Sequence, residues 1–538
     1  MKKLWQALLL VRRCDRRSFR LRLLYVTLQS VLPLVNLYIL KLLVDAVEDG
    51  VRGNGSMEGV MLYLAVMVFV FLANRIVSAL NAVNNDVLGQ RLVDYMADLM
   101  QRQAARLDMA YYDNPDYYDS LHRAQQEASS RPLAILGNFM SLFGSLLSIA
   151  GIVALLATAT WWIIVVMVVA VVPGFLVRLY KARRIYRFRR ENTQLYRRTG
   201  YYSALLSSRD YAKEMRAYSL IDFFRSRFVD SRRQLVGELL RISRRLGALD
   251  VLSGIVEAAA MFAVVGLLVS QAFAAAITMG TFVMLFEAFR RGQGYLSSLV
   301  ASIAALYDNR LFVTNLFDFL DFEPQVLSPA EPLPMPQKIE TVEFRDVTFR
   351  YPDMQRDVLQ HYSLVARVGE VTRIEGENGF GKSTLVKLLL RLYDPQQGQV
   401  LINGIDIRRF SLDDLRTAVA VLFQDFGRYA LTAEENIALG NLSDSRLRQA
   451  AALAHADTII DRLPDKYANM LGRTFDGGAE LSMGQWQRIA LARLLYTDAP
   501  VLVLDEPTAW MDIPTRELFN DTVDKLRHNK TIIIITHS

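Results

Sequence analysis

Six long apolar runs dominate the first 310 residues of the chain. Each run is long enough to cross a hydrocarbon core of about 30 Å as a helix. A large soluble protein does not need so many apolar helices of this length, so the pattern predicts a helical membrane domain with six spans. The runs are Leu23–Leu43, Val60–Leu80, Leu133–Thr158, Trp161–Val177, Val251–Ala274 and Ile277–Ala305.

Two long polar segments, Asn81–Arg131 and Arg178–Asp250, keep apolar residues at helical spacing. This spacing predicts that the spans continue as helices well beyond the membrane. Each segment has a break near its middle, at Asp113–Asp116 and at Ser207–Asp210. We expect a short helix at each tip, which either docks onto a second domain or simply closes a helical hairpin.

The charges of the loops predict the orientation of the chain. Arg178–Arg245 contains nineteen Lys/Arg and six Asp/Glu, whereas Ala46–Gly59 has Arg52 as its only basic residue. Because basic loops remain on the cytoplasmic side, we expect a multi-pass protein of the inner (cytoplasmic) membrane with both termini in the cytoplasm. The short apolar run at the start, followed by arginines without a cleavage site, predicts an interfacial helix rather than a signal peptide.

Composition narrows the function further. The net charge of +7 is concentrated between the apolar runs, which favours the rim of a membrane protein over a nucleic-acid-binding protein. Cys14 is the only cysteine and the five histidines are scattered, which argues against an intrachain disulfide, a cysteine metal cage or a zinc site.

A second domain follows a proline-spaced linker, Pro324–Pro336. Apolar residues then alternate, at Val342, Phe344, Val347 and Phe349, and short strands alternate with helices in an α/β manner. We therefore expect an interfacial helix over 1–20, the membrane domain over 21–320, a linker over 321–337 and an α/β domain over 338–538.

The α/β domain contains a phosphate-binding loop. A predicted strand, Glu370–Ile374, and a predicted helix, Ser383–Leu392, flank a match to the pattern of Gly, four residues, then Gly-Lys-Ser. Backbone N–H groups of such a loop hold a polyphosphate at the helix N-terminus, while the lysine reaches the outer phosphates and the serine binds Mg²⁺. The loop comprises Gly376, Glu377, Asn378, Gly379, Phe380, Gly381, Lys382, Ser383 and Thr384.

Two further apolar strands carry candidate catalytic groups. Val501–Leu504 ends in Asp505 and Glu506, which can hold Mg²⁺ through water and polarise an attacking water; alternatively, the pair only caps the strand. The strand Thr531–Ile535 delivers His537 to the same edge, where it either contacts the γ-phosphate or is structural.

A second anion-binding helix start lies at Leu481–Gln485, where Ser482 and the Gly484 N–H precede a helix expected to begin near Trp486. The chain thus has two phosphate-binding helix starts but only one lysine loop. This suggests that two chains share nucleotide between them.

In this order the motifs resemble those of ATP-binding cassette (ABC) transporters, specifically half-transporters of the exporter type. Tyr351 looks like the aromatic residue that stacks on adenine, and Gly376–Thr384 is similar to the Walker A loop. Leu481–Gln485, with Ser482, Gly484 and Gln485, resembles the signature sequence that contacts nucleotide across a dimer. Gln424 looks like the Q-loop residue that senses Mg²⁺, Asp505 and Glu506 resemble the Walker B pair, Asp512 the D-loop aspartate, and His537 the switch histidine.

The resemblance implies ATP and Mg²⁺ as ligands and ATP-driven export of a hydrophobic or amphipathic peptide, lipid or drug-like substrate by alternating access. The resemblance also implies that the chain pairs with a second half-transporter, in a homodimer or a heterodimer. Leu107–Asp116 is reminiscent of bacterial exporters of lanthionine peptides. An importer or ATP-gated channel on the same scaffold is the alternative; the apolar runs argue against a soluble cassette protein of DNA repair or translation.

Some positions depart from the family pattern. Met483 stands where the family usually has glycine, and Ala509–Asp512 replaces the usual Ser-Ala-Leu-Asp, which puts the hydrolysis rate in question. The family also continues beyond the switch histidine, so we expect a further C-terminal segment after Ser538.

Ionisable residues occur at membrane depth, where they are costly and usually face a bundle interior or a water-filled path. Glu287, Arg290 and Arg291 have the spacing for mutual pairing on one helix, or they line a cavity for a polar or amphipathic cargo. Glu257 and the aromatic residues Phe282, Phe286 and Phe289 are further candidates for that cavity.

Overall fold

The computed structural model describes residues 2–53, 55–114, 131–157, 162–352, 354–377, 380–440, 442–511 and 513–536. The chain divides into two compact units. The first consists of Met1–Ala104 with Ser120–Asp321, and the second of Ala105–Asp119 with Phe322–Ser538.

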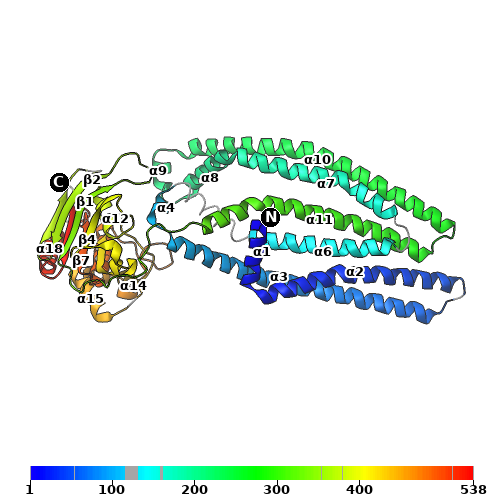
Figure 1. The fold of residues 1–538 in the computed structure, drawn as a ribbon, viewed down its shortest axis with the longest axis horizontal. Coiled ribbons are helices and arrows are strands. Elements are labelled where there is room, and N and C mark those ends of the chain that lie inside the picture. The colour runs from blue at the N-terminus through cyan, green and yellow to red at the C-terminus, as the bar shows by residue number, and fades with distance from the viewer. Residues whose placement is uncertain are drawn as a thin grey trace. The chain divides into compact units, whose positions relative to one another are not determined.

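Long helices build the first unit (Figure 1). They contain nearly all of each predicted apolar run, and several continue into the polar segments, as the helical spacing of those segments predicts. The helices are α1 (Lys2–Cys14), α2 (Arg16–Val51), α3 (Met57–Arg106), α6 (Arg131–Ala157), α7 (Trp162–Glu191), α8 (Thr193–Ser207), α9 (Ala212–Ala217), α10 (Ile221–Phe273) and α11 (Met279–Leu320).

Five helices of the described chain, α2, α3, α6, α7 and α10, are long and apolar enough to cross a membrane. The sixth predicted run forms α11, which is not among them because Glu287, Arg290 and Arg291 interrupt its apolar sequence. This helix packs instead against α2, α6 and α7. Its Leu285 and Phe289 are fully buried in the core of the helical unit, together with Leu37, Ile152, Leu156, Ile163, Met167, Val264 and Leu268.

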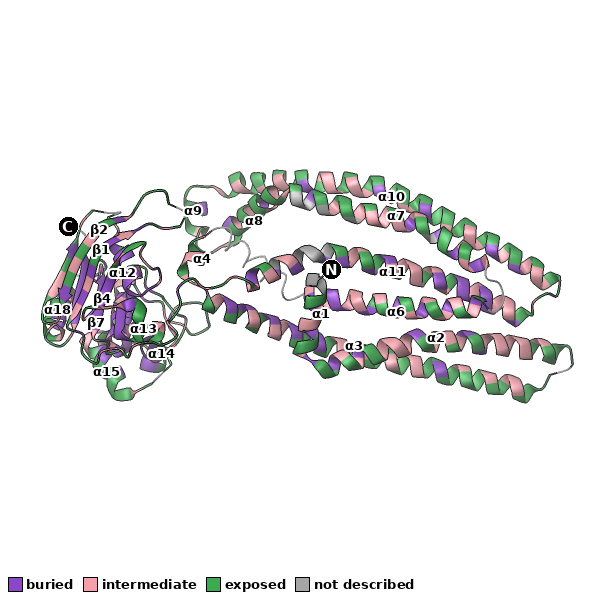
Figure 2. Ribbon diagram, viewed as in Figure 1, coloured by how far each residue is buried: buried purple, intermediate pink, exposed green. Residues whose placement is uncertain are grey.

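Large apolar side chains remain exposed along the outside of the helical unit (Figure 2). On α3, Phe69 and Phe71 are 71% and 60% exposed, and on α10 Phe262 is 74% exposed. Contact of so much apolar surface with water is unfavourable at about 25 cal/mol per Å². The exposed surface is therefore suited to a lipid environment.

Both predicted breaks in the polar segments occur where helices end. In the second segment α8 ends at Ser207 and the short helix α9 follows. In the first, α3 leads into the five-residue helix α4 (Met109–Asp113), while Pro115 and Asp116 lie outside the described residues.

Asp15 separates α1 from α2 and caps the N-terminus of α2. Its Oδ1 accepts hydrogen bonds from the backbone N–H groups of Arg17 and Ser18, both at 3.0 Å. The Ser18 hydroxyl donates to Oδ2 at 2.8 Å, and Arg91 of α3 forms an ion pair with the same oxygen. These bonds, above all that from the Ser18 N–H, stabilise the ionised form and lower the pKa of Asp15 to about 2.

Two sheets build the second unit. The antiparallel sheet has the order β2-β1-β4-β5 and the parallel sheet the order β3-β8-β7-β6. Helix α12 (Lys382–Leu389) packs into a core that both sheets share, and α17 (Met483–Tyr496) belongs to a second core that reaches the parallel sheet. The strands are β1 (Thr341–Phe349), β2 (Leu359–Arg367), β3 (Val371–Glu375), β4 (Gln397–Ile402), β5 (Ile405–Asp406), β6 (Val419–Leu422), β7 (Val501–Asp505) and β8 (Thr531–Thr536).

Strand β1 shows why the predicted alternation skips a position. Val342, Phe344, Val347 and Phe349 are all at most 2% exposed, although two residues rather than one separate Phe344 from Val347. The pairing of β1 with β2 shifts between Phe344 and Val347, where Asp346 adopts a positive φ of 54°. This irregularity returns Val347 to the buried face.

Replacement of Asp15 by alanine should destabilise the helical unit by about 1 kcal/mol at pH 7, because α2 loses its N-cap. The check is thermal unfolding of detergent-solubilised protein followed by tryptophan fluorescence. Since folding lowers the pKa of Asp15 from 3.8 to about 2, its contribution is complete above about pH 4 and disappears as the pH falls towards 2. Asp15→Asn, which keeps the cap acceptor, is the control; equal midpoints for wild type and Asp15→Ala at pH 7 would contradict the assignment.

Candidate nucleotide-binding site

The predicted site residues meet at the carboxyl edge of the parallel sheet. Glu375 at the end of β3 pairs with Thr536 of β8, and Ile535 pairs with Asp505 of β7. The phosphate loop follows β3 directly and leads into α12. The carboxyl edge of an open parallel sheet is the usual place for a ligand in α/β proteins.

The loop enters the helix through a glycine that no other residue can easily replace. Gly381 is the N-cap of α12 and has a φ of +83°. A Cβ at this position would lie 2.8 Å from a methyl carbon of Leu359. The turn therefore keeps the backbone close to β2 and leads into α12, whose first N–H groups point towards the loop.

Lys382 lies inside this loop and is only 7% exposed. Its Nζ donates to the carbonyl oxygen of Gly376 and, at 3.2 Å, to that of Thr536. The ammonium group is thus held at the junction of the loop with β8 by neutral oxygens. Phosphate oxygens offer a cation a stronger interaction than these carbonyls do.

Ser383 and Asp505 are adjacent, as a shared metal ligand set requires. The Ser383 hydroxyl donates to Oδ2 of Asp505 at 3.1 Å, and Asp505 is 4% exposed. Two oxygen donors at this separation, one anionic, have the chemistry that Mg²⁺ prefers. The residues therefore fit a magnesium ion.

Glu506 adopts a left-handed backbone conformation, with a φ of +49°. Its N–H donates to the Ile535 carbonyl at 3.0 Å. Its own carbonyl accepts a hydrogen bond from the buried Gln487 side chain of α17 at 3.3 Å. Sequence reasoning missed Gln487, because an isolated glutamine in a helix gives no signal of what it contacts.

The signature segment forms the start of α17, three residues earlier than predicted. Ser482 is the N-cap, and its hydroxyl accepts from the Gln485 N–H while the Gln485 side chain accepts from the Ser482 N–H. This capping box explains the early start, because it satisfies donors of the first turn. Met483 is the first helical residue, where the backbone needs no glycine.

Gly484 lies against the segment that follows Glu506. A Cβ on Gly484 would lie 2.5 Å from the backbone carbonyl oxygen of Trp510. The absence of a side chain therefore permits a close backbone approach between the signature helix and the D-loop segment.

Tyr351 is joined to the phosphate-loop helix. Its hydroxyl and the Thr384 hydroxyl are 3.0 Å apart, and its ring packs edge-on against Phe349 and Tyr393. Lys387 Nζ lies 5.1 Å from the ring centroid of Tyr351. A stacking base would share this ring with the lysine.

Three further predicted residues are described, and all three are exposed. They are Gln424, two residues after β6, and Glu377 and Phe380 of the loop. Asn378, Gly379, Asp512 and His537 lie outside the described residues.

Helix α4 belongs to the same compact unit as the α/β domain. Asp108 accepts hydrogen bonds from the backbone N–H groups of Gln325 and Val326, the latter at 3.1 Å. The Tyr111 hydroxyl donates to the Glu323 carbonyl at 2.7 Å. At its other end, Asp113 accepts from the hydroxyl of Tyr393 and lies 3.8 Å from the Lys387 ammonium group.

A second candidate site lies in the helical unit. A cavity of about 550 Å³ is lined by polar side chains that include Asn36, Asn74, Arg290 and Arg291. Arg290 donates two hydrogen bonds to Glu287, at 3.0 and 2.8 Å. Arg291 donates to Glu287 at 3.4 Å and to the Pro33 carbonyl at 3.3 Å.

Arg290 and Arg291 therefore both pair with Glu287 and line the cavity, so the two alternatives expected from the sequence occur together. The expectation for Phe289 was wrong: it is fully buried in the core with Leu285 and Ala288.

Residues 359–509 match the family model described as "ABC transporter". Along its whole length the chain is 27% identical to the subtilin transport ATP-binding protein of Bacillus subtilis, covering 88% of that protein. The nisin transport ATP-binding protein of Lactococcus lactis subsp. lactis is also 27% identical, over 95% of this chain and 85% of its own length.

The fold is similar to that of a bacterial Atm1-family ABC exporter with ATP bound. The TM-score is 0.74 at 22% identity, over 98% of this chain and 91% of that one. Over its whole length the chain resembles exporter-type ABC half-transporters. It joins a membrane-type helical unit to an ABC ATPase domain, and that domain binds nucleotide.

Replacement of Gly484 by alanine should lower both the ATPase rate and the melting temperature. Alanine is the better helix former, but its Cβ would meet the Trp510 carbonyl, and an overpacked contact of this kind costs about 1–3 kcal/mol. ATPase assays and thermal unfolding check the result. Gly237→Ala, in a helix with no heavy atom near the added Cβ, is the control; equal effects of the two changes would contradict the close approach.

Proposed function

We propose that this protein is an ATP-driven exporter of an amphipathic cargo, with a peptide as the leading candidate. It lies in the inner (cytoplasmic) membrane with both termini in the cytoplasm, and it works as a dimer of this chain or with a related half-transporter. The observation that carries the proposal is the meeting of Lys382, Ser383 and Asp505 at one sheet edge, in a chain that also has five apolar spans. The two relatives similar over most of their length, which transport the peptides subtilin and nisin, favour a peptide.

In this proposal the residues of the site divide the work of ATP hydrolysis. Lys382 and the loop N–H groups bind the phosphates, and Tyr351 stacks on the base. Ser383, Asp505 and Gln424 would hold Mg²⁺, which neutralises charge on the phosphates when bound. Glu506 orients and deprotonates the attacking water, with His537 near the γ-phosphate.

A second copy of the chain completes each site. Its Ser482, Gly484 and Gln485 would meet the γ-phosphate, and its Asp512 would lie at the seam between the two ATPase domains. The capping box at Ser482 supports this role, because the N-terminus of α17 is a preformed anion site. Closure of the two domains on ATP then changes the access of the membrane cavity.

Glu506→Gln should reduce ATP hydrolysis by at least about 100-fold while leaving ATP bound, because the variant loses its general base and keeps the phosphate loop. ATPase assays and nucleotide retention on the purified dimer measure both effects. Lys382→Ala is the matched control, since it should lose ATP binding itself. Full hydrolysis in Glu506→Gln would remove this residue from its proposed role.

Transport direction is tested separately, with inside-out membrane vesicles. Mass spectrometry of material that copurifies with Glu506→Gln identifies the cargo, and ATP-dependent uptake of that cargo into the vesicles supports export. ATP-dependent release from the vesicles would indicate an importer, and passive flux gated by ATP would indicate a channel.

The cavity beside α11 is proposed as part of the cargo path. Arg290 and Arg291 share one carboxylate, so the group retains a net positive charge at membrane depth. Arg291→Ala should reduce stimulation of the ATPase by the copurified cargo about 10-fold, the effect of losing one charged hydrogen bond. Basal ATPase is the control readout, and unchanged stimulation would exclude Arg291 from the cargo path.

A further inference from the structure

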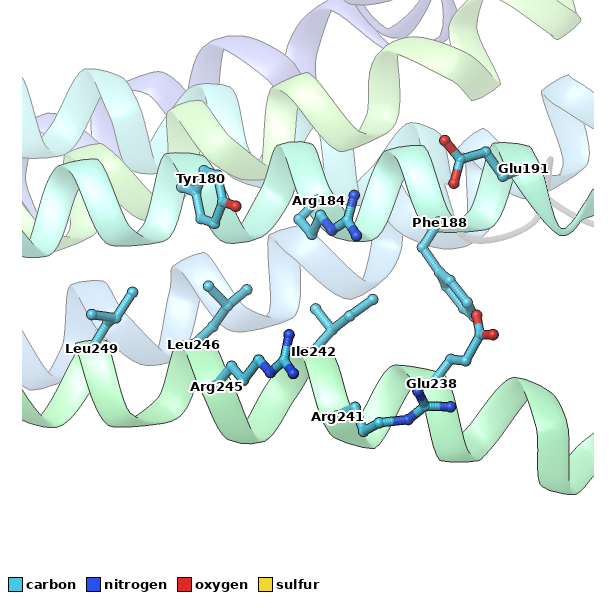
Figure 3. A pocket seen from close by; sticks show the side chains of 10 residues that line it. All are labelled: Tyr180, Arg184, Phe188, Glu191, Glu238, Arg241, Ile242, Arg245, Leu246 and Leu249. Atoms are coloured by element: carbon cyan, nitrogen blue, oxygen red, sulfur yellow. The ribbon is translucent and has the colours of Figure 1, made fainter.

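A second cleft lies between α7 and α10, in the arginine-rich part of the helical unit (Figure 3). Its volume is about 550 Å³. On α7 it begins three residues after the apolar run that ends at Val177, and on α10 it ends two residues before the run that begins at Val251. The cleft therefore starts where the membrane spans end and continues away from the bilayer.

The side chains of the cleft are ordered along its length. Tyr180, Leu246 and Leu249 lie at the end next to the spans. Arg184 and Arg245 follow, and Glu191 and Glu238 lie at the far end, as Figure 3 shows. The charged side chains thus change from cationic to acidic with distance from the apolar end, with the apolar Ile242 and Phe188 among them and Arg241 beside Glu238.

The arginines of the cleft have no partner elsewhere in the described chain. No hydrogen bond or ion pair joins Arg184, Arg241 or Arg245 to another described residue. Nearby, at the membrane end, Lys181 and Asp250 do pair, with 3.5 Å between Nζ and Oδ2. All three guanidinium groups are exposed, and they outnumber the two carboxylates that line the same cleft, so the cleft attracts an anion.

We infer that this cleft binds an anionic phospholipid of the cytoplasmic leaflet, with its phosphate among Arg184, Arg241 and Arg245. Guanidinium groups match phosphate geometry, and basic pockets between membrane helices on the cytoplasmic side recognise anionic headgroups. Acyl chains lie against Tyr180, Leu246 and Leu249. A free phosphate would leave that apolar end unused, which is why the order of the lining favours a lipid.

The carboxylates at the far end suit the headgroup of phosphatidylglycerol. Its glycerol hydroxyls are hydrogen-bond donors, and Glu191 and Glu238 supply acceptors beyond the phosphate position. The site depends on the orientation of the spans and is independent of cargo and of ATP hydrolysis. If the protein proved not to transport a cargo, the lipid-binding site would still be expected.

The test compares the full-length protein with the triple variant Arg184→Gln, Arg241→Gln and Arg245→Gln. Both are loaded with dioleoylphosphatidylglycerol or dioleoylphosphatidylcholine in mixed micelles, and retained lipid is counted by native mass spectrometry. Wild type should retain phosphatidylglycerol at least about 10-fold more strongly than phosphatidylcholine, and the triple variant should lose this preference.

The control removes the same charge outside the cleft, through Arg225→Gln, Arg232→Gln and Arg244→Gln, and should keep the preference. ATP binding reports that each variant is folded. If the control variant lost the preference for phosphatidylglycerol equally, the effect would be one of general surface charge and the proposed site would be wrong. An unchanged preference in the cleft variant would also overturn the site. Displacement of phosphatidylglycerol by inorganic phosphate at constant ionic strength would make the cleft a free-anion site and overturn the lipid assignment.

Discussion

The negative charge of a bound polyphosphate has to be neutralised at one edge of one parallel sheet, and the ATPase unit is arranged around this requirement. Four strands end at this edge, so that residues far apart in the chain, such as Lys382 and Asp505, meet there. Burial of both side chains lowers the local dielectric constant and strengthens every charge interaction with the ligand. The hydrogen bond between Ser383 and Asp505 keeps the oxygen donors together at the edge.

Helix α4 shows how a segment that follows a membrane helix becomes part of the ATPase unit. It continues the chain directly from α3, yet its contacts are with the linker and with residues near the phosphate loop. Lys387 lies between Asp113 of α4 and the ring of Tyr351, which is itself bonded to Thr384. A shift of Tyr351 and Thr384, which are proposed to contact the nucleotide, is therefore mechanically connected to a shift of α4 through a few side chains.

Local sequence patterns predicted much of this architecture, because each element satisfies its own requirements. The period of apolar residues predicted the spans and the buried positions of β1, and the glycine-lysine-serine spacing predicted the phosphate loop. What the sequence did not reveal depends on contacts between distant residues. The bond between Gln487 and Glu506 and the early start of α17 belong to this class, and so do the burial of Phe289 and the contacts of Asp108.

Glu506 illustrates a cost that its proposed catalytic role would impose on stability. A non-glycine residue in the left-handed region is held there at an expense of about 1–3 kcal/mol, which the surrounding bonds to Ile535 and Gln487 must offset. In the proposed mechanism, a glycine at this position would relax the backbone and leave a more stable but inactive ATPase. Directed evolution for thermostability alone would therefore drift towards sequences that have lost the proposed catalytic carboxylate, unless turnover were selected at the same time.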